Sequence, residues 1–161
     1  MARHSRMPNK AVSTGTGALM IPGRLSALLP LLNPRRYVDA SYMASIAAHL
    51  YGGRLRSQPE LARQYAAELR SGGAWGYYSQ LLAGAGWTSI WWLHTLRQPT
   101  LILSGRHDPI VPWVNGRIMA QLIPNSRLHL FDDGHLGLLT SAAELAPIIR
   151  DFLLQETEVA V

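Results

Sequence analysis

The chain has 161 residues, enough for one domain with a substantial hydrophobic core. With 48% hydrophobic and 16% charged residues it is not a largely disordered protein, and without cysteine it has no disulfide, thiolate metal site or cysteine nucleophile. The net charge is +5, but apart from Arg35 and Arg36 the basic residues are scattered singly, so a nucleic-acid partner is not expected.

Two further patterns bear on the compartment. No run of about 18 or more apolar residues occurs, so a membrane-spanning helix is not expected. The first residues, MARHSRMPNK, are basic, but no apolar stretch follows them directly, and we do not read them as a signal peptide. Together with the lack of cysteine, these features favour a cytoplasmic protein.

The chain begins with a polar, basic stretch. Residues 1–13 are expected to be disordered, or to contain the remnant of a strand at Ala11–Ser13. Between residues 14 and 34, glycines and prolines punctuate short apolar pieces, which is typical of a loop that leads into a lid. Gly15 and Gly17 do not form a phosphate-binding loop, because the third glycine and the Lys-Ser/Thr pair of such a loop are missing.

Residues 35–70 have the periodicity of helices. Asp39 or Ser41 can cap a first helix, which the YGG sequence at 51–53 ends. A second helix carries Pro59 near its first turn, where the missing N–H costs nothing, and a glycine pair ends it.

Four of the five tryptophans fall between residues 75 and 96, in an apolar segment that glycines interrupt. They are Trp75, Trp87, Trp91 and Trp92. In one interpretation these side chains pack inside a lid; in the other they form a hydrophobic surface for substrate. The second interpretation makes Trp87, Trp91 and Trp92 candidate substrate-binding residues.

From Gln98 the pattern changes to alternating strands and helices. A continuous apolar run predicts a buried strand at Thr100–Leu103, and alternating residues predict another at Arg127–Phe131. The helices expected after them are Trp113–Leu122 and Ser141–Leu154. Ser141 and Glu144 have the spacing of a capping box. This order indicates the end of a doubly wound parallel sheet, an α/β fold.

The expected organisation has four parts. A disordered or strand-bearing start is followed by a helical lid, a core segment and a tail, with bounds 1–13, 14–96, 97–156 and 157–161.

An aspartate follows the first predicted strand of the core segment. Asp108 comes after a short Gly-Arg-His turn, and Pro109 and Pro112 stiffen the loop behind it. A carboxylate that orients a catalytic histidine has to be fixed at the carboxyl end of a strand, within reach of the imidazole. Asp108 suits this role of catalytic acid, and the alternative is an aspartate that only caps a turn before proline.

A histidine follows the second predicted strand. His135 comes about one strand-helix-strand unit after Asp108, a spacing that brings the two loops side by side at one sheet edge. Such a histidine is a candidate catalytic base. Of its neighbours Asp132 and Asp133, one is expected to cap the loop and the other to be exposed, and His107 is expected to be exposed as well. The remaining histidines show no metal-ligand spacing, so no metal or cofactor is expected; they are His4, His49, His94 and His129.

A nucleophile is not found. The pentapeptide G-x-S-x-G, which presents a serine between a strand and a helix, does not occur in the chain. Ser104 ends the acid strand itself and cannot also supply that turn. The chain carries an acid and then a base, the last two triad members in the chain order of α/β-hydrolases.

Several segments resemble the intracellular poly(3-hydroxyalkanoate) depolymerases of the medium-chain-length type, within the α/β-hydrolase superfamily. They include GALMIPG, NPRRYV, GWTSIWWLH, QPTLILSG and DDGHL, and the resemblance covers about residues 14–156. It implies hydrolysis of ester bonds in a hydrophobic polyester by a serine, with Asp108 as the acid and His135 as the base. It also implies that the tryptophan-rich lid segments lie near the substrate.

The family's N-terminal half, with its oxyanion loop and nucleophile elbow, has no counterpart here, so we expect the C-terminal portion of the α/β-hydrolase fold. Three alternatives stay open for the isolated chain. It is a catalytically incompetent fragment, a non-catalytic module that binds hydrophobic polyester or a granule surface, or one part of an enzyme that a separate N-terminal chain completes. A bare sheet edge would also favour self-association.

Overall fold

One parallel sheet forms the centre of the molecule. The computed structural model describes residues 10–14, 21–68, 74–84 and 87–155. The three strands lie in the order β1 (Ala11–Ser13), β2 (Thr100–Gly105) and β3 (Ser126–Phe131). Thr100 of β2 lies opposite both Ala11 and Ser126, and both pairings are parallel. The sequence was compatible with either disorder or a strand at residues 11–13, and these residues form a strand.

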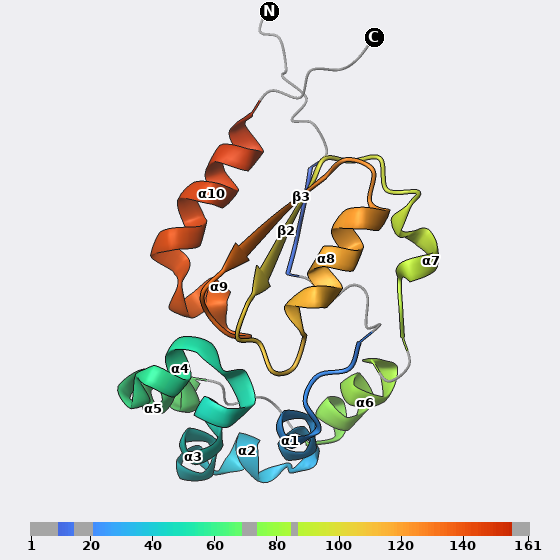
Figure 1. Ribbon diagram of the computed structural model, residues 1–161. Coiled ribbons are helices and arrows are strands. Elements are labelled where there is room, and N and C mark those ends of the chain that lie inside the picture. The colour runs from blue at the N-terminus through green and yellow to red at the C-terminus, as the bar shows by residue number, and fades with distance from the viewer. Residues whose placement is uncertain (1–9, 15–20, 69–73, 85–86, 156–161) are drawn as a thin grey trace, which may run out of the picture.

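One helix covers each face of the sheet (Figure 1). Every residue of β2 is buried, which is why its sequence is a continuous apolar run. On one face Ile102 packs against Met119 of α8 (Trp113–Leu122). On the other, Leu103 packs in a cluster with Leu145 of α10 (Ala142–Leu154). The predicted strand-helix-strand-helix order after Gln98 is confirmed.

A group of helices gathers beyond the carboxyl ends of the strands, at the bottom of Figure 1. They are α1 (Leu25–Leu28), η1 (Leu29–Leu32), α2 (Arg35–Val38), α3 (Ala40–Tyr51), α4 (Gly53–Ser57), α5 (Pro59–Glu68) and α6 (Ala74–Gly84). A second core forms among α3, α4 and α5, with Met43, Leu50 and Leu55 buried in it. Another short helix, α7 (Ile90–Leu93), packs beside α8 through Leu93.

Asn115 ties the segment before α1 to the core. Its side chain is fully buried in α8 and makes two hydrogen bonds with the main chain of Ile21. Its Oδ1 accepts from the Ile21 N–H at 2.9 Å, and its Nδ2 donates to the Ile21 carbonyl at 2.8 Å. Nearby, Arg24 N–H donates to the Pro109 carbonyl at 2.8 Å. The chain is thereby fixed against the loop that follows β2.

Asp39 caps α3; it is one of the two residues predicted as the cap. Its Oδ1 accepts from the Tyr42 N–H at 3.0 Å. Hydrogen bonds from the Ser41 hydroxyl, from that N–H and from the Arg35 guanidinium hold the pKa of Asp39 well below its ordinary value. The cap therefore stays ionised and favours the start of the helix.

Two local predictions differ from the structure, and one helix was not predicted. The segment 14–34, predicted as a loop, contains α1 and η1, while residues 15–20 lie outside the described part. The YGG turn ends α3 as predicted, but α4, which was not predicted, begins at once, because Gly52 and Gly53 adopt φ of 67° and 52° and redirect the chain. The capping box at the start of α10 does not form, because the Ser141 hydroxyl donates to Asp133 instead.

Within the described residues, no helix combines the length and the apolar character that crossing a membrane requires.

Candidate active site

Asp108 is held by its own loop. Its Oδ1 accepts hydrogen bonds from the N–H groups of Ile110 and Val111, both at 2.8 Å. This arrangement is an Asx turn around Pro109, so the two prolines fix the loop and the loop fixes the carboxylate. The side chain is only 9% exposed. One carboxylate oxygen, Oδ2, is left to face the next strand's loop.

The structure brings Asp108 and His135 together. The Nδ1 atom of His135 lies 2.9 Å from Asp108 Oδ2. An ionised carboxylate only accepts, so we assign the ring proton to Nδ1, which leaves a lone pair on Nε2. The His135 side chain is 28% exposed, so the ring is accessible from one side. Such an imidazole can take a proton from a hydroxyl while the carboxylate stabilises the resulting positive charge.

The YGG turn of α3 and α4 supports His135. The His135 N–H donates to the Tyr51 carbonyl at 2.8 Å, and the Tyr51 ring stacks on the imidazole with centroids 6.1 Å apart and planes at 10°. A Cβ atom on Gly134 would collide with the Tyr51 carbonyl oxygen, so this approach requires glycine. Sequence reasoning missed Tyr51, because a tyrosine before two glycines is an ordinary helix end.

Asp133 is the buried neighbour of the base. Its side chain is 2% exposed and accepts four hydrogen bonds, from the N–H groups of Arg54 and Gly134 and from the hydroxyls of Thr140 and Ser141. Burial alone would raise the pKa of Asp133, but these four donors outweigh burial and hold that pKa below its ordinary value. The carboxylate is therefore ionised inside the protein.

Asp132 and His107 lie at the surface. Their side chains are 82% and 59% exposed, and His107 Nε2 lies 2.8 Å from Asp132 Oδ1. Asp132 is thus the exposed member of the aspartate pair and Asp133 the one that caps the loop. His107 has the exposure expected from the sequence.

A small cavity of about 140 Å³ adjoins the acid and the base. Its lining consists of Thr14, Leu103, Gly105, Asp108, Phe131, Gly134, His135 and Leu138. Thr14 directly follows β1, so the cavity lies where the carboxyl ends of all three strands meet. No serine is among these lining residues.

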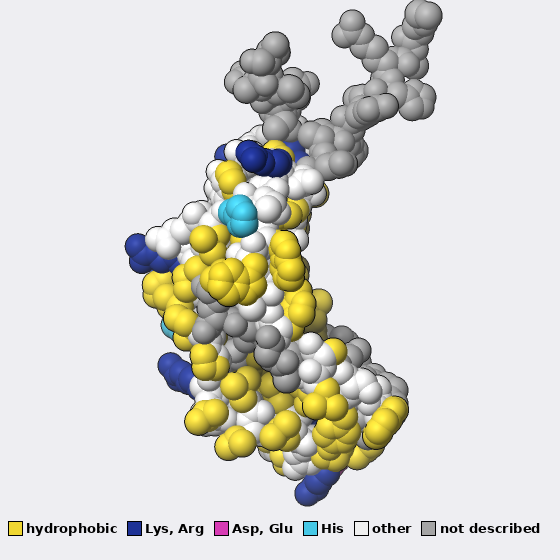
Figure 2. All heavy atoms as spheres, turned by 90° about the vertical axis from the view of Figure 1, so that its right-hand side faces the viewer, with side chains coloured by type: hydrophobic (Ala, Val, Ile, Leu, Met, Phe, Trp, Pro, Cys, Tyr) yellow, Lys and Arg dark blue, Asp and Glu magenta, His cyan; other side chains and the backbone are white. Residues whose placement is uncertain are grey.

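The three candidate tryptophans lie elsewhere. Trp87, Trp91 and Trp92 are 51%, 72% and 62% exposed, on α7 and just before it, and none lines the cavity beside His135. Figure 2 views the molecule from the side of α7 and α8 and shows hydrophobic side chains spread over this face. The interpretation in which they pack inside a lid does not fit these exposures.

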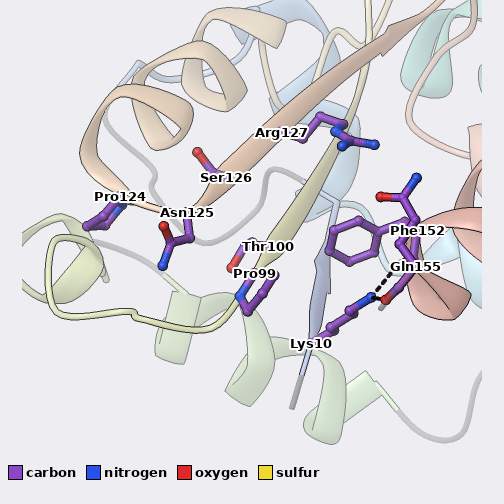
Figure 3. A pocket seen from close by; sticks show the side chains of 9 residues that line it. All are labelled: Lys10, Pro99, Thr100, Pro124, Asn125, Ser126, Arg127, Phe152 and Gln155. Atoms are coloured by element: carbon purple, nitrogen blue, oxygen red, sulfur yellow. Dashed lines mark hydrogen bonds between the residues drawn. The ribbon is translucent and has the colours of Figure 1, made fainter. Parts of the chain in front are cut away.

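A second cavity, of about 240 Å³, lies at the opposite end of the strands (Figure 3). Lys10 enters it just before β1 and donates from Nζ to the carbonyls of Phe152, at 2.7 Å, and of Gln155. The same ammonium lies 5.3 Å from the centre of the Phe152 ring. These contacts fix the last turn of α10, where a cation suits the free carbonyls. Among the described residues, no group of three or more His, Cys, Asp or Glu could hold a metal ion.

A family model covers the part of the sequence that carries this site. The model described as the alpha/beta hydrolase fold matches residues 24–142. The chain belongs to the α/β-hydrolases. This finding confirms the predicted fold class, and the strands β2 and β3 with their helices correspond to a C-terminal portion of this fold.

Relatives of this α/β-hydrolase chain support the resemblance seen in its sequence. A poly(3-hydroxyalkanoate) depolymerase of Ectopseudomonas oleovorans is 53% identical over 149 residues, which are 92% of this chain and 53% of the relative. A 2-hydroxymuconate semialdehyde hydrolase of Pseudomonas putida is 34% identical over 64 residues, 39% of this chain and 23% of the relative. The chain spans about half the length, or less, of the curated relatives that it matches.

Solved α/β-hydrolase structures share the fold. The enol-lactonase from Burkholderia xenovorans LB400 superposes with a TM-score of 0.73 at 20% identity, covering 95% of this chain and 59% of that one. A thermophilic esterase from Thermogutta terrifontis gives a TM-score of 0.67 at 23% identity, covering 89% and 55%.

Proposed function

We propose that this chain is the acid- and base-bearing part of a serine-type hydrolase that cleaves the ester bonds of poly(3-hydroxyalkanoate). The observation that carries the proposal is the 2.9 Å contact between His135 Nδ1 and Asp108 Oδ2 beside a cavity at the carboxyl ends of the strands. The relative from E. oleovorans supports the polyester as substrate, because it is 53% identical over 92% of this chain.

In this proposal His135 acts as general base and Asp108 as the acid that orients it. His135 Nε2 takes the proton of a serine hydroxyl while that oxygen attacks the ester carbonyl, and it then returns the proton to the leaving alcohol. Asp108 holds the Nδ1–H form and stabilises the imidazolium between these two steps. The serine and the oxyanion hole come from a polypeptide segment outside this sequence, since G-x-S-x-G is absent from it.

The test supplies the missing segment. The chain is mixed, or co-expressed, with the part of the E. oleovorans depolymerase that it does not match, and hydrolysis of a medium-chain p-nitrophenyl ester is followed. We expect no turnover by either part alone and turnover by the pair. His135→Ala in this chain should abolish that turnover, and Asp108→Asn should lower it by roughly 10⁴-fold. Equal turnover by the pair with His135→Ala would contradict the proposal.

A second function, binding of the polyester without turnover, is favoured by the exposed tryptophans. Such a surface can adsorb to a hydrophobic granule, because large apolar side chains at 62% and 72% exposure gain free energy by leaving water. We expect the chain to sediment with medium-chain polyester particles. Trp91→Gln with Trp92→Gln should weaken this binding, and Leu154→Gln, at an exposed site on α10, should leave it unchanged.

A further inference from the structure

A buried carboxylate next to the base has no part in proton transfer. Asp133 is separated from His135 by Gly134 alone, and its Oδ1 accepts from the Gly134 N–H at 2.7 Å. The same oxygen accepts from the Arg54 N–H at the start of α4, also at 2.7 Å. The peptide that leads into His135 is therefore bound to a carboxylate that is itself bound to the helical part of the chain.

The second carboxylate oxygen holds the chain on the other side of the base. Asp133 Oδ2 accepts from the hydroxyls of Thr140 and Ser141, each at 2.6 Å, where α9 (Gly137–Thr140) meets α10. The Arg54 guanidinium also lies beside this carboxylate. Its Nε is 3.8 Å from Oδ2, and its Nη1 donates to the Thr140 carbonyl at 3.0 Å. The loop that carries His135, the base loop, is thus held by hydrogen bonds on both sides of this residue in the sequence.

The main chain of Asp133 also contacts the loop that carries Asp108, the acid loop. Its carbonyl accepts from the His107 N–H at 3.0 Å, one residue before Asp108. One residue therefore contacts both loops whose separation sets the His135–Asp108 distance. An error of about 1 Å in that separation would break the hydrogen bond between them.

Stability alone does not explain an ionised group at this place. A buried charge is costly to desolvate, and a well-packed apolar side chain often stabilises a protein as much. A carboxylate offers instead two acceptor atoms with fixed geometry, which can hold four donors from separate segments at once. That is the property needed to locate a base.

We infer that Asp133 is a positioning residue, which fixes the ring of His135 against Asp108 by joining the base loop, the acid loop and the start of α4. Its chemical meaning rests on the proposed function, but the arrangement can be tested without any turnover. Free neutral histidine prefers the Nε2–H tautomer, whereas the contact with Asp108 requires the Nδ1–H tautomer. The tautomer of His135 therefore reports whether the pair is assembled.

The experiment reads the His135 tautomer from long-range ¹H–¹⁵N spectra at a pH where the ring is neutral. We expect the Nδ1–H form in the unaltered chain, and its loss in Asp133→Ala. Asp133→Asn should restore it, because the amide keeps an acceptor for both N–H groups and the Thr140 hydroxyl can donate to the Leu136 carbonyl, already 3.1 Å away. Asp132→Ala is the matched control, one residue earlier and exposed, and should leave the tautomer unchanged.

Retention of the Nδ1–H form in folded Asp133→Ala would overturn the inference, as would equal loss in Asp132→Ala. If Asp133→Ala does not fold, the double variant Thr140→Val, Ser141→Ala removes two donors and keeps the carboxylate. The Nδ1–H form should then decline, and its full retention would overturn the inference. Failure of the hydrolysis test leaves these tautomer results unaffected, so the two proposals fail separately.

Discussion

Glycine at position 53 shows how tightly the helical part approaches the base loop. Gly53 has φ of 52°, and a Cβ atom there would collide with Gly134 N and with the carboxylate of Asp133. Both the backbone conformation and the contact therefore exclude a side chain. The turn that separates α3 from α4 is a precondition for the geometry of the base.

We predict that Gly53→Ala destabilises the chain by at least about 2 kcal/mol, because strain at positive φ adds to a backbone collision. Urea unfolding measures the effect. Gly76→Ala is the control: it lies within α6 with nothing within 4 Å of the added Cβ, so it should be neutral or slightly stabilising. Equal stabilities of the two variants would contradict the structure of the turn.

The pKa of Asp133 predicts a dependence of stability on pH. Because this pKa lies below its ordinary value in the folded chain, the unfolded chain binds the proton first as the pH falls. The stabilisation is fully present above the ordinary pKa, about 4, and is lost as the pH drops through the lower, folded value. The free energies of unfolding of the unaltered chain and of Asp133→Asn should therefore become more alike as the pH falls from 5 to the lowest pH at which the chain still folds. A difference between these two free energies that stays constant with pH would contradict the prediction. Asp39 is present in both chains, so its own contribution cancels in the difference.

At the scale of elements, sheet and long helices follow from the sequence while short helices do not. The helix at Trp113–Leu122 has the predicted bounds, because Pro112 ends the preceding loop and the apolar period is clear. The four-residue helices α1 and α9 carry no such period, and contacts distant in sequence position them. Arg24 N–H, for example, binds the Pro109 carbonyl at the start of α1. Local patterns cannot predict such elements.

The two faces of α10 make a direct comparison. Leu145 is 1% exposed against the sheet, and Leu154, at the end of the same helix, is 68% exposed. Leu145→Ala should lower the free energy of unfolding by about 2–5 kcal/mol, because it leaves a cavity in the core. Leu154→Ala should change it by no more than about 0.5 kcal/mol. Similar values for both, measured by denaturant unfolding, would show that α10 does not pack on the sheet as described.

Only part of the site could be predicted from the sequence, because the rest depends on how distant parts of the chain come together. Parallel strands end at one edge, so the order of strand, acid, strand and base is sufficient to predict that Asp108 and His135 meet. Asp133 was not singled out, because burial of one of two adjacent aspartates depends on donors from Arg54, Thr140 and Ser141, which no local pattern brings together. The exposure of the tryptophans likewise depends on what covers α7.

The sheet leads to a prediction about association. Within the described residues β1 pairs with β2 alone, so its other edge is open to a further strand, and Val12 of β1 is 40% exposed. We expect the isolated chain to self-associate with increasing concentration, as measured by sedimentation. Trp91→Gln with Trp92→Gln should reduce the association if the aromatic face contributes. A monomer with one cooperative melting transition well above about 50 °C would contradict this expectation.

The clamp of Asn115 on Ile21 has a chemical consequence. Asn115 is followed by Gly116, the sequence in which a main-chain nitrogen most readily attacks the side-chain amide and converts asparagine to aspartate or isoaspartate. In the folded chain both atoms of that amide are bound to Ile21 and buried, within a helix that keeps the attacking nitrogen out of reach. Deamidation at Asn115 then requires local opening. Its slow accumulation in a stored sample would record how often the contact between α8 and the segment before α1 comes apart.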